Sequence, residues 1–348
     1  MKRQSIRTSL MIAALLMLTS ASYGSTLYVA NNGLDGSSCG AKKSPCRSIS
    51  QAVNTNAADG DTIIVGPGGY GDLNRNGTLG DSPGEEAGGF DCVLLVARAV
   101  TITSSDGAAA TTIDGRNDST SCNVGIVVDG TQFGKPGKGF TVTNTSLGQG
   151  KGIVLNANNL AVQGNQVIAT DGSGLGTGIY TVDFPEDILI EGNQVVGWGF
   201  GMWVQGTGKR VLKNSLTQNS IAIFASGTNL ISGNLITSNY EAIEAAGPGA
   251  GDLIGNAVYA NVIGFGVDVP FGGRIEKNNI FGNSCCGLEN GDPTFGGVLG
   301  LDATNNYWGA STGPGSDPSD GVCNLGGGTS VTTPFATKPF KVKAPIKP

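Results

Sequence analysis

The stretch VQGNQV at residues 162–167 has an apolar residue, an Asn three places later and a second apolar residue two places after that, and this pattern occurs five more times along the chain. The later copies are IEGNQV (190–195), VLKNSL (211–216), ISGNLI (231–236), LIGNAV (253–258) and IEKNNI (275–280). Their asparagines are separated by 28, 21, 20, 22 and 22 residues, at Asn165, Asn193, Asn214, Asn234, Asn256 and Asn278. A unit this small cannot bury its own apolar face, so successive units must stack.

Between these asparagines lie short alternating runs of Ile, Val and Leu, broken by Gly and Asn. This pattern indicates strands and tight turns rather than helices. If each strand pairs with its equivalent one unit later, the chain forms a parallel β-helix. A further asparagine follows five places later in four units, at Asn219, Asn239, Asn261 and Asn283. We expect all of these asparagines to be structural, because Asn tolerates the left-handed backbone region and stacked amides can hydrogen-bond along the axis.

Both ends of the repeat region carry a family resemblance. LYVANNGLDGSSCGAKKSPCRSISQAV (27–53), followed by GDTIIVGPGGY (60–70), resembles the opening segment of the pectin-lyase-like superfamily of secreted proteins. NNYWGASTGPGSDP (305–318) is similar to the closing coil of many members. The resemblance implies an all-β fold, a right-handed parallel β-helix with a short N-terminal capping helix near residues 48–55. It does not fix an activity, because the superfamily includes polysaccharide lyases, glycoside hydrolases, uronate epimerases and adhesins.

The first 24 residues are predicted to be a secretory signal peptide. Lys2, Arg3 and Arg7 precede an apolar run at 10–18 that is too short to span a membrane, and small residues follow it. We therefore expect a secreted, periplasmic or cell-surface protein without a membrane span. The remaining chain divides into a capping segment with the first coil (25–75), the β-helix coils (76–310) and a closing segment with a Pro- and Lys-rich tail (311–348).

The charge and the missing histidine exclude several functions. Without the three leader cations the chain has about nine more acidic than basic residues, which argues against nucleic acid as a partner. The sequence contains no histidine, so a Ser-His-Asp mechanism is excluded. We expect a monomer whose partner is a polysaccharide.

Seven cysteines in an exported chain predict disulfides. Cys39 and Cys46 enclose a short loop and form the safest pair. Cys92 with Cys122 is a second pair, and Cys323 pairs with either Cys285 or Cys286. One cysteine is left over.

The strand before each repeated turn begins with a small residue and an apolar one, as in GMWVQG (201–206) and AIEAAG (242–247). If the second residue points into the core, alternation sends the third outward. The second residues are Ile126, Ile153, Ile179, Met202, Ile223, Ile243, Val267 and Leu288. The outward row then reads Val127, Val154, Tyr180, Trp203, Phe224, Glu244, Asp268 and Glu289. This order predicts a row of aromatic side chains continued by a row of acids.

Such a face is typical of a carbohydrate groove. We assign Tyr180, Trp203 and Phe224 to substrate binding, together with Gln205 in the same strand as Trp203. Glu244, Asp268 and Glu289 are candidate catalytic residues, since neighbouring strands would place them about 5 Å apart and alternate strands about 9–10 Å apart. As an alternative, stacked aromatics can stabilise a parallel sheet without a ligand.

Basic residues favour a lyase as a second possibility. Lyases of the superfamily use Arg or Lys as the base and often Ca²⁺. Arg210 and Arg274 each precede a repeated asparagine by four places. We assign Arg274 to catalysis and Arg210 to substrate binding, with solvated surface charge as the alternative.

The segment DLNRNG (72–77) matches half of a calcium loop. Asp72, Asn74, Asn76 and Asp81 are the candidate Ca²⁺ ligands, although Pro83 replaces the expected bidentate Glu. An ordinary Asx turn is the alternative. The leading hypothesis is therefore an exported protein that binds and degrades a polysaccharide as a lyase or glycoside hydrolase. The other is a non-catalytic surface or adhesion protein that binds glycan or protein.

Overall fold

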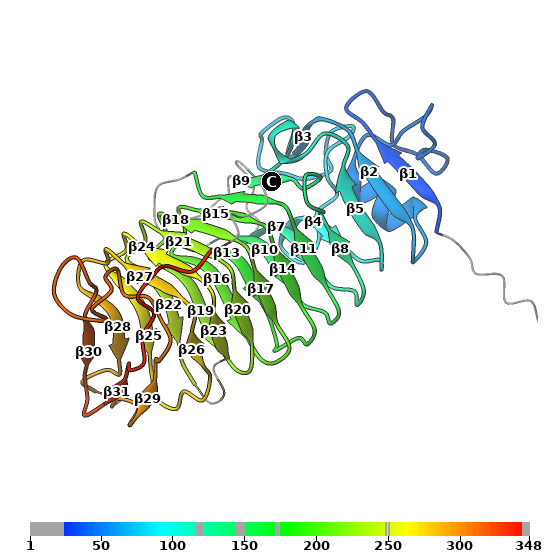
Figure 1. Cartoon of the computed structure of the whole chain (residues 1–348). Coiled ribbons are helices and arrows are strands. Elements are labelled where there is room, and N and C mark those ends of the chain that lie inside the picture. The colour runs from blue at the N-terminus through cyan, green and yellow to red at the C-terminus, as the bar shows by residue number, and fades with distance from the viewer. Residues whose placement is uncertain are drawn as a thin grey trace, which may run out of the picture.

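The computed structural model describes residues 24–115, 121–143, 150–170, 175–247, 249, 251–294 and 296–342. It is a right-handed parallel β-helix in which each complete coil, from β2–β3–β4 to β26–β27–β28, contributes one strand to each of three long parallel sheets. Figure 1 shows the coils stacked from β1 at the N-terminal end to β28–β31 at the other. None of the helices in this part of the chain is long and apolar enough to cross a membrane.

The strands are grouped by sheet in stacking order. Sheet 1 holds β1 (Thr26–Val29), β2 (Thr62–Val65), β5 (Thr101–Ser104), β8 (Gln132–Phe133), β11 (Ala161–Gln163), β14 (Leu189–Glu191), β17 (Arg210–Leu212), β20 (Leu230–Ser232), β23 (Asp252–Ile254) and β26 (Ile275–Glu276). Sheet 2 holds β3 (Gly68–Gly71), β6 (Thr111–Asp114), β9 (Thr141–Thr143), β12 (Gln166–Ile168), β15 (Gln194–Val196), β18 (Ser215–Thr217), β21 (Leu235–Thr237), β24 (Ala257–Tyr259) and β27 (Asn279–Phe281). Sheet 3 holds β4 (Cys92–Val96), β7 (Cys122–Ile126), β10 (Lys151–Leu155), β13 (Thr177–Thr181), β16 (Phe200–Gln205), β19 (Ile221–Ser226), β22 (Glu241–Ala245), β25 (Ile263–Val267), β28 (Cys286–Asn290) and β30 (Val322–Asn324).

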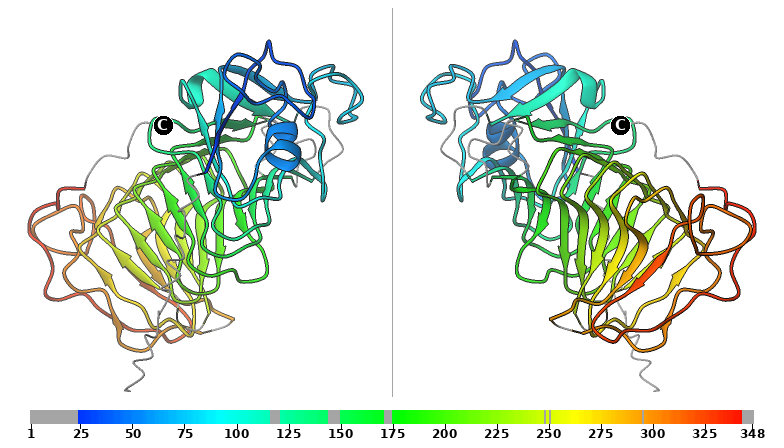
Figure 2. Two further views of the ribbon diagram at one scale, coloured as in Figure 1. Left: turned by 90° about the vertical axis from the view of Figure 1, so that its right-hand side faces the viewer. Right: turned by 90° about the vertical axis from the view of Figure 1, so that its left-hand side faces the viewer.

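Short elements close the two ends of the stack. The helix η1 (Gln51–Asn56) lies at the N-terminal end of the stack (Figure 2). Its residues Ala52 and Val53 are fully buried. This is the region where a capping helix is expected. A second short helix is η2 (Ala108–Ala110), and β29 (Leu301–Asp302) pairs with β31 (Ser330–Val331) near the C-terminal end.

The core is a set of apolar columns, one from each sheet. In sheet 3 the column includes Met202, Ile223 and Ile243, which are fully buried and occupy matching positions in successive strands. Burying an Ile or Leu side chain contributes roughly 1.5–3 kcal/mol. Since every coil adds one such residue to each sheet, the repeat in the sequence becomes a continuous core.

Two asparagine ladders hold the corners of the coils. The first runs between sheets 1 and 2 from Asn165 to Asn306 and is fully buried or nearly so. Within it, Asn234 Nδ2 donates to Val211 O (2.9 Å) and to Asn256 Oδ1 (3.0 Å), and its Oδ1 accepts from the backbone N of Asn214 (2.8 Å). The stacking prediction is thus confirmed. The left-handed residue, however, is the one before each asparagine, such as Gly192 (φ 66°).

The second ladder lies between sheets 2 and 3. It runs through Asn219, Asn239, Asn261 and Asn283 and ends on Asp320, whose Oδ2 accepts from Asn283 Nδ2 at 2.6 Å. Asp320 therefore takes the place of a further asparagine, with its pKa raised mainly by burial. The sequence pattern missed it, because Asp320 lies 37 residues after Asn283 instead of the usual interval.

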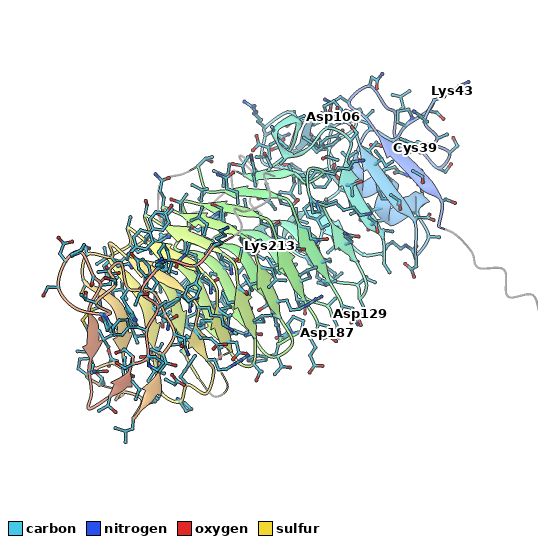
Figure 3. All side chains as sticks on the ribbon, viewed as in Figure 1. Cys39, Lys43, Asp106, Asp129, Asp187 and Lys213 are labelled. Atoms are coloured by element: carbon cyan, nitrogen blue, oxygen red, sulfur yellow. A yellow bond between two sulfur atoms is a disulfide. The ribbon has the colours of Figure 1, made fainter. Side chains whose placement is uncertain are left out.

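The predicted disulfides are confirmed. Cys39 pairs with Cys46 and Cys92 with Cys122, and Cys286 is the partner of Cys323. Cys285 keeps a free, exposed thiol. Figure 3 labels Cys39 close to β1, at the N-terminal end of the stack.

Candidate functional site

The outer face of sheet 3 carries two rows of outward residues. The chain bends at a small buried residue near the start of each strand, for example Ala222 in β19 and Ala242 in β22. Residues on either side of this bend, three places apart, therefore both face outward. The central row is Tyr180, Trp203, Phe224, Glu244, Gly266 and Glu289. The leading row is Lys151, Thr177, Phe200, Ile221, Glu241, Ile263 and Cys286, of which Thr177, Ile263 and Cys286 are buried by their surroundings.

The aromatic end of the face has the predicted order. Tyr180, Trp203 and Phe224 occupy consecutive rungs, and all three are half-buried. The ring centroids of Trp203 and Phe224 are 4.3 Å apart, and those of Tyr180 and Trp203 are 6.3 Å apart. Trp203 thus points outward, with one side covered by neighbouring rings.

A fourth aromatic belongs to this cluster and was missed by the sequence analysis. Phe200 of the leading row packs edge-on against Trp203, with ring centroids 4.6 Å apart. Lys151 Nζ lies 5.5 Å from the centroid of the Tyr180 ring, a cation–π contact. The indole Nε1 of Trp203 is buried and has no hydrogen-bond partner among the described residues. The signal for it in the sequence is an aromatic residue, Phe200, directly before Gly201 of GMWVQG.

The predicted register is wrong at one acidic rung. Gly266, not Asp268, pairs with both Glu244 and Glu289. The reason is that β25 bends at Gly264 and places Phe265 in the core column, fully buried between Ile243 and Leu288.

The same two-residue shift applies near the N-terminal end of the face. Gly125 instead of Val127 is the outward neighbour of Val154, and Val124 takes the core position predicted for Ile126. In β25 the sequence offers two small–apolar pairs, Gly264–Phe265 and Gly266–Val267, and packing against the neighbouring coils selects the first. In β7 the core residue Val124 follows Asn123, so the small–apolar pattern does not mark it. The residues predicted for the core, Ile126 and Val267, are nevertheless buried.

Glu241 fills the gap that Gly266 leaves in the acidic row. A Cβ placed on Gly266 would lie only 1.9 Å from Glu241 Oε1, so the Glu241 carboxyl rests directly over this glycine. The acids are therefore arranged as Glu244, the Glu241 carboxyl and Glu289. Glu244 and Glu289 are two rungs apart, as expected, which corresponds to about 9–10 Å between strands.

The pKa values of these carboxyls are raised. Burial raises the pKa of Glu241 to about 8, and the charges of Glu244, Glu289 and Asp268 add to the effect. The pKa of Glu244 is raised mainly by burial and also by the charge of Asp268. The pKa of Glu289 is likewise raised mainly by burial, followed by the charges of Asp268 and Asp292. Asp268 thus stays electrostatically close although it leaves the row.

No basic residue compensates the acids within the described part of the chain. The ion pairs formed there by Lys213, Arg274 and Lys277 all involve other carboxylates, those of Glu191, Asp252 and Glu276. Nor do three carboxylate oxygens from different described residues lie within 4.8 Å of one another. The cluster is therefore repulsive and is spread more widely than the ligand shell of a single ion.

The remaining predicted residues separate between two faces. Gln205 lies on sheet 3 beyond Trp203, in register with Ser226. Arg210 belongs to β17 of sheet 1, where it lines a depression of about 400 Å³ with Asp187, a residue labelled at the edge of the coils in Figure 3. Arg274 also lies beside sheet 1, and its guanidinium contacts Asp252 at 2.5 Å. The structure thus does not bring either arginine to the acidic row.

The predicted calcium loop is closed by its own hydrogen bonds. Both carboxylate oxygens of Asp72 accept backbone N–H groups, from Arg75 at 2.6 Å and Gly77 at 2.7 Å. Asn74 and Asn76 direct their Nδ2 atoms to Asp81, at 2.9 and 2.6 Å. The oxygens do not converge on one point, so this geometry favours the Asx-turn alternative.

A solved structure supports the fold. The chain is similar to a protein whose structure is described as "Crystal structure of pectate lyase Pel9A", with 15% sequence identity and a TM-score of 0.52. The similarity covers 91% of this chain and 79% of that one. At this identity the likeness shows the fold alone. No curated protein matches the sequence.

A protein family matches more than half of the chain. The family described as "Periplasmic copper-binding protein (NosD)" matches residues 99–312. This range runs from the coil of β5 to the closing segment and includes both rows of sheet 3. The chain therefore belongs to the NosD family.

Proposed function

We propose that this chain is an exported polysaccharide-binding and polysaccharide-degrading β-helix protein that acts at the outer face of sheet 3. The periplasmic location in the family description supports export. Tyr180, Trp203, Phe224 and Phe200 bind sugar rings, and the acids that continue the row act on the bond to be cleaved. The observation that carries the proposal is Glu241, a carboxyl held over Gly266 between two other carboxylates.

Glu241 has the protonation state that a general acid needs. With a pKa of about 8 it keeps its proton at neutral pH. It lies about one strand spacing, near 5 Å, from the rungs of Glu244 and Glu289, which is close to the separation found in retaining glycoside hydrolases. We assign Glu241 as the proton donor and Glu244 or Glu289 as its carboxylate partner.

Hydrolysis fits this face better than elimination. A lyase of the predicted type needs an Arg or Lys base near the reacting carbon, whereas Arg210 belongs to sheet 1 and Arg274 lies beside it, directly before β26. The cation in contact with the aromatic row is Lys151, at its far end from the acids.

Calcium remains a proposal for the acidic row rather than for the loop at 72–77. The acids are too far apart to surround one ion by themselves, so Ca²⁺ would bind between a carboxylate of the row and the carboxylate of a uronate substrate, where it would reduce their repulsion. Activity that requires Ca²⁺ only on uronate polymers would support this role.

The proposal is tested with a polysaccharide panel, with and without Ca²⁺. Reducing-end release measures chain cleavage by either reaction, and ultraviolet absorbance of unsaturated ends appears only with elimination, so reducing ends without absorbance identify hydrolysis. Glu241→Gln is expected to abolish product while oligosaccharide binding persists. Glu276→Gln, an acid on sheet 1, is the matched control and should leave the rate unchanged. Binding without product from any glycan, unaffected by Glu241→Gln, would instead establish the non-catalytic surface protein.

Copper, named in the family description, does not fit the disulfide-bonded chain. Proteins bind copper mainly through imidazole, thioether and thiolate groups. The chain has no histidine, and Met202 is the one methionine beyond the predicted leader and is fully buried in the core. Six of the seven cysteines are in disulfides, which leaves the Cys285 thiol as the accessible soft donor in the described chain.

A further inference from the structure

The turn between β13 and β14 differs from those that follow it at the same corner of the coils. It has seven residues, 182–188, whereas the turns after β16 and β19 have four and three. In these shorter turns glycine takes the left-handed positions, at Gly206 (φ 91°) and Gly227 (φ 92°). In the longer turn Asp183 and Phe184 are left-handed instead, both with φ 55°. This conformation costs a residue other than glycine roughly 1–2 kcal/mol.

A buried lysine of the next coil fixes this turn. Lys209 is 1% exposed, and its Nζ donates a hydrogen bond to Pro185 O. Burial lowers the pKa of Lys209 to about 8, and the charges of Glu186 and Asp187 oppose this effect. Figure 3 labels Asp187 at the edge of the coils. Taking an ammonium group out of water costs free energy, so the chain holds this turn in one position at a cost in stability.

The turn presents Phe184 to solvent at the edge of sheet 3. Phe184 is 63% exposed, and a Cβ added to Gly206 would lie 3.1 Å from the Cβ of Phe184. Gly206 directly follows Gln205, the last residue of β16. It lies three residues beyond Trp203, which corresponds to about 10 Å along the strand. Phe184 is therefore a further exposed ring, displaced sideways from the aromatic row.

We infer that Phe184 binds a neutral sugar that branches from a polysaccharide chain lying along the aromatic row. The inference rests on the sugar-binding role proposed for that row. A chain that follows the row runs along the stack of coils, from one rung to the next. Phe184 lies to one side of this line, so a linear chain in contact with Trp203 cannot reach it, whereas a branch can.

The residues around Phe184 favour a neutral branch. Gln205 lies between Trp203 and Phe184 and is half-buried, and its amide can donate to and accept from sugar hydroxyls. Asp183 and Glu186 are exposed acids on either side of Phe184 in the chain. Their charges repel an acidic sugar.

The test measures the affinity of the whole chain for matched oligosaccharides by calorimetry. All proteins carry Glu241→Gln, so that the ligands are not cleaved. Each pair, of mannan, xylan or rhamnogalacturonan, consists of a linear oligosaccharide and the same chain with one neutral sugar branch. The protein is expected to bind the branched member of at least one pair roughly tenfold more tightly, as for one aromatic contact. Phe184→Ala should reduce this affinity to that for the linear member, which should not change.

Two further variants separate the ring from the turn that holds it. Phe90→Ala is the matched control, because Phe90 is also left-handed (φ 46°) and 82% exposed but precedes β4, near the other end of sheet 3; it should keep the preference. Lys209→Met should lose the preference and keep its affinity for the linear member, because Lys209 positions the turn. Loss of the fold would instead lower both affinities alike.

Equal affinities for the linear and branched members of all pairs, or a preference retained in Phe184→Ala, would overturn the inference and leave the aromatic row as a sugar site. A preference retained in Lys209→Met would overturn the positioning role of the lysine. Absence of binding to every oligosaccharide would overturn both this inference and the proposed function.

Discussion

Replacing Glu241 by Gln should remove much of the pH dependence of stability. The Glu241 pKa is about 8 in the folded chain and 4.5 in its unperturbed state. Below pH 4.5 the side chain is protonated in both states. Between these values the folded chain keeps a proton that the unfolded chain has released, so stability falls as pH rises. At 1.36 kcal/mol per pKa unit the loss reaches about 4–5 kcal/mol above pH 8.

Urea unfolding of wild type and Glu241→Gln at several pH values from 4.5 to 9 measures this effect. The two proteins should have similar midpoints at pH 4.5, and at pH 9 the variant should be more stable by the contribution of Glu241 alone, about 4–5 kcal/mol. A shallower decline should remain in the variant, because Glu244, Asp268 and Glu289 also have raised pKa values. Parallel stability curves for the two proteins would refute the placement of the Glu241 carboxyl among these acids.

Three further changes test the ladder, the glycine rung and the aromatic row. Asn234→Ala leaves two buried main-chain groups unpaired and should cost about 2–6 kcal/mol in urea unfolding, whereas Ala at the exposed Asn32 should cost little. Gly266→Ala should displace the flexible Glu241 carboxyl and so lower the activity. It should also flatten the pH dependence of stability, with little change in stability at pH 5, and an unchanged pH dependence would contradict this. Trp203→Ala should weaken oligosaccharide binding roughly tenfold in calorimetry, and an unaltered affinity would rule out the aromatic row as the sugar site.

Much of the sheet 3 face could be predicted from the sequence. Tyr180, Trp203 and Phe224 fall on consecutive rungs because GIYTVD, GMWVQG and AIFASG each contain a single small–apolar pair, so alternation has one solution. The prediction failed at Asp268, where Gly264 and Gly266 offer two solutions. It also missed Phe200 and Glu241, because strict alternation does not allow two outward residues three places apart. The bend at Gly201 or Ala242 makes that arrangement possible.

The sequence by itself determined the architecture of this protein. Its period of about 22 residues, its asparagines and its apolar columns require stacked coils, because no single unit can bury its own apolar face. Only the tertiary structure decided which side chains meet on the surface. Arg210 and Arg274 are separated from the acids because they lie on a different sheet, and Cys286 rather than Cys285 pairs with Cys323 because it lies in the strand beside β30. Glu241 becomes a half-buried acid with a raised pKa because the glycine on the next rung has no side chain to exclude its carboxyl. Such contacts depend on register between strands more than 20 residues apart, which packing against neighbouring coils selects and local pattern does not.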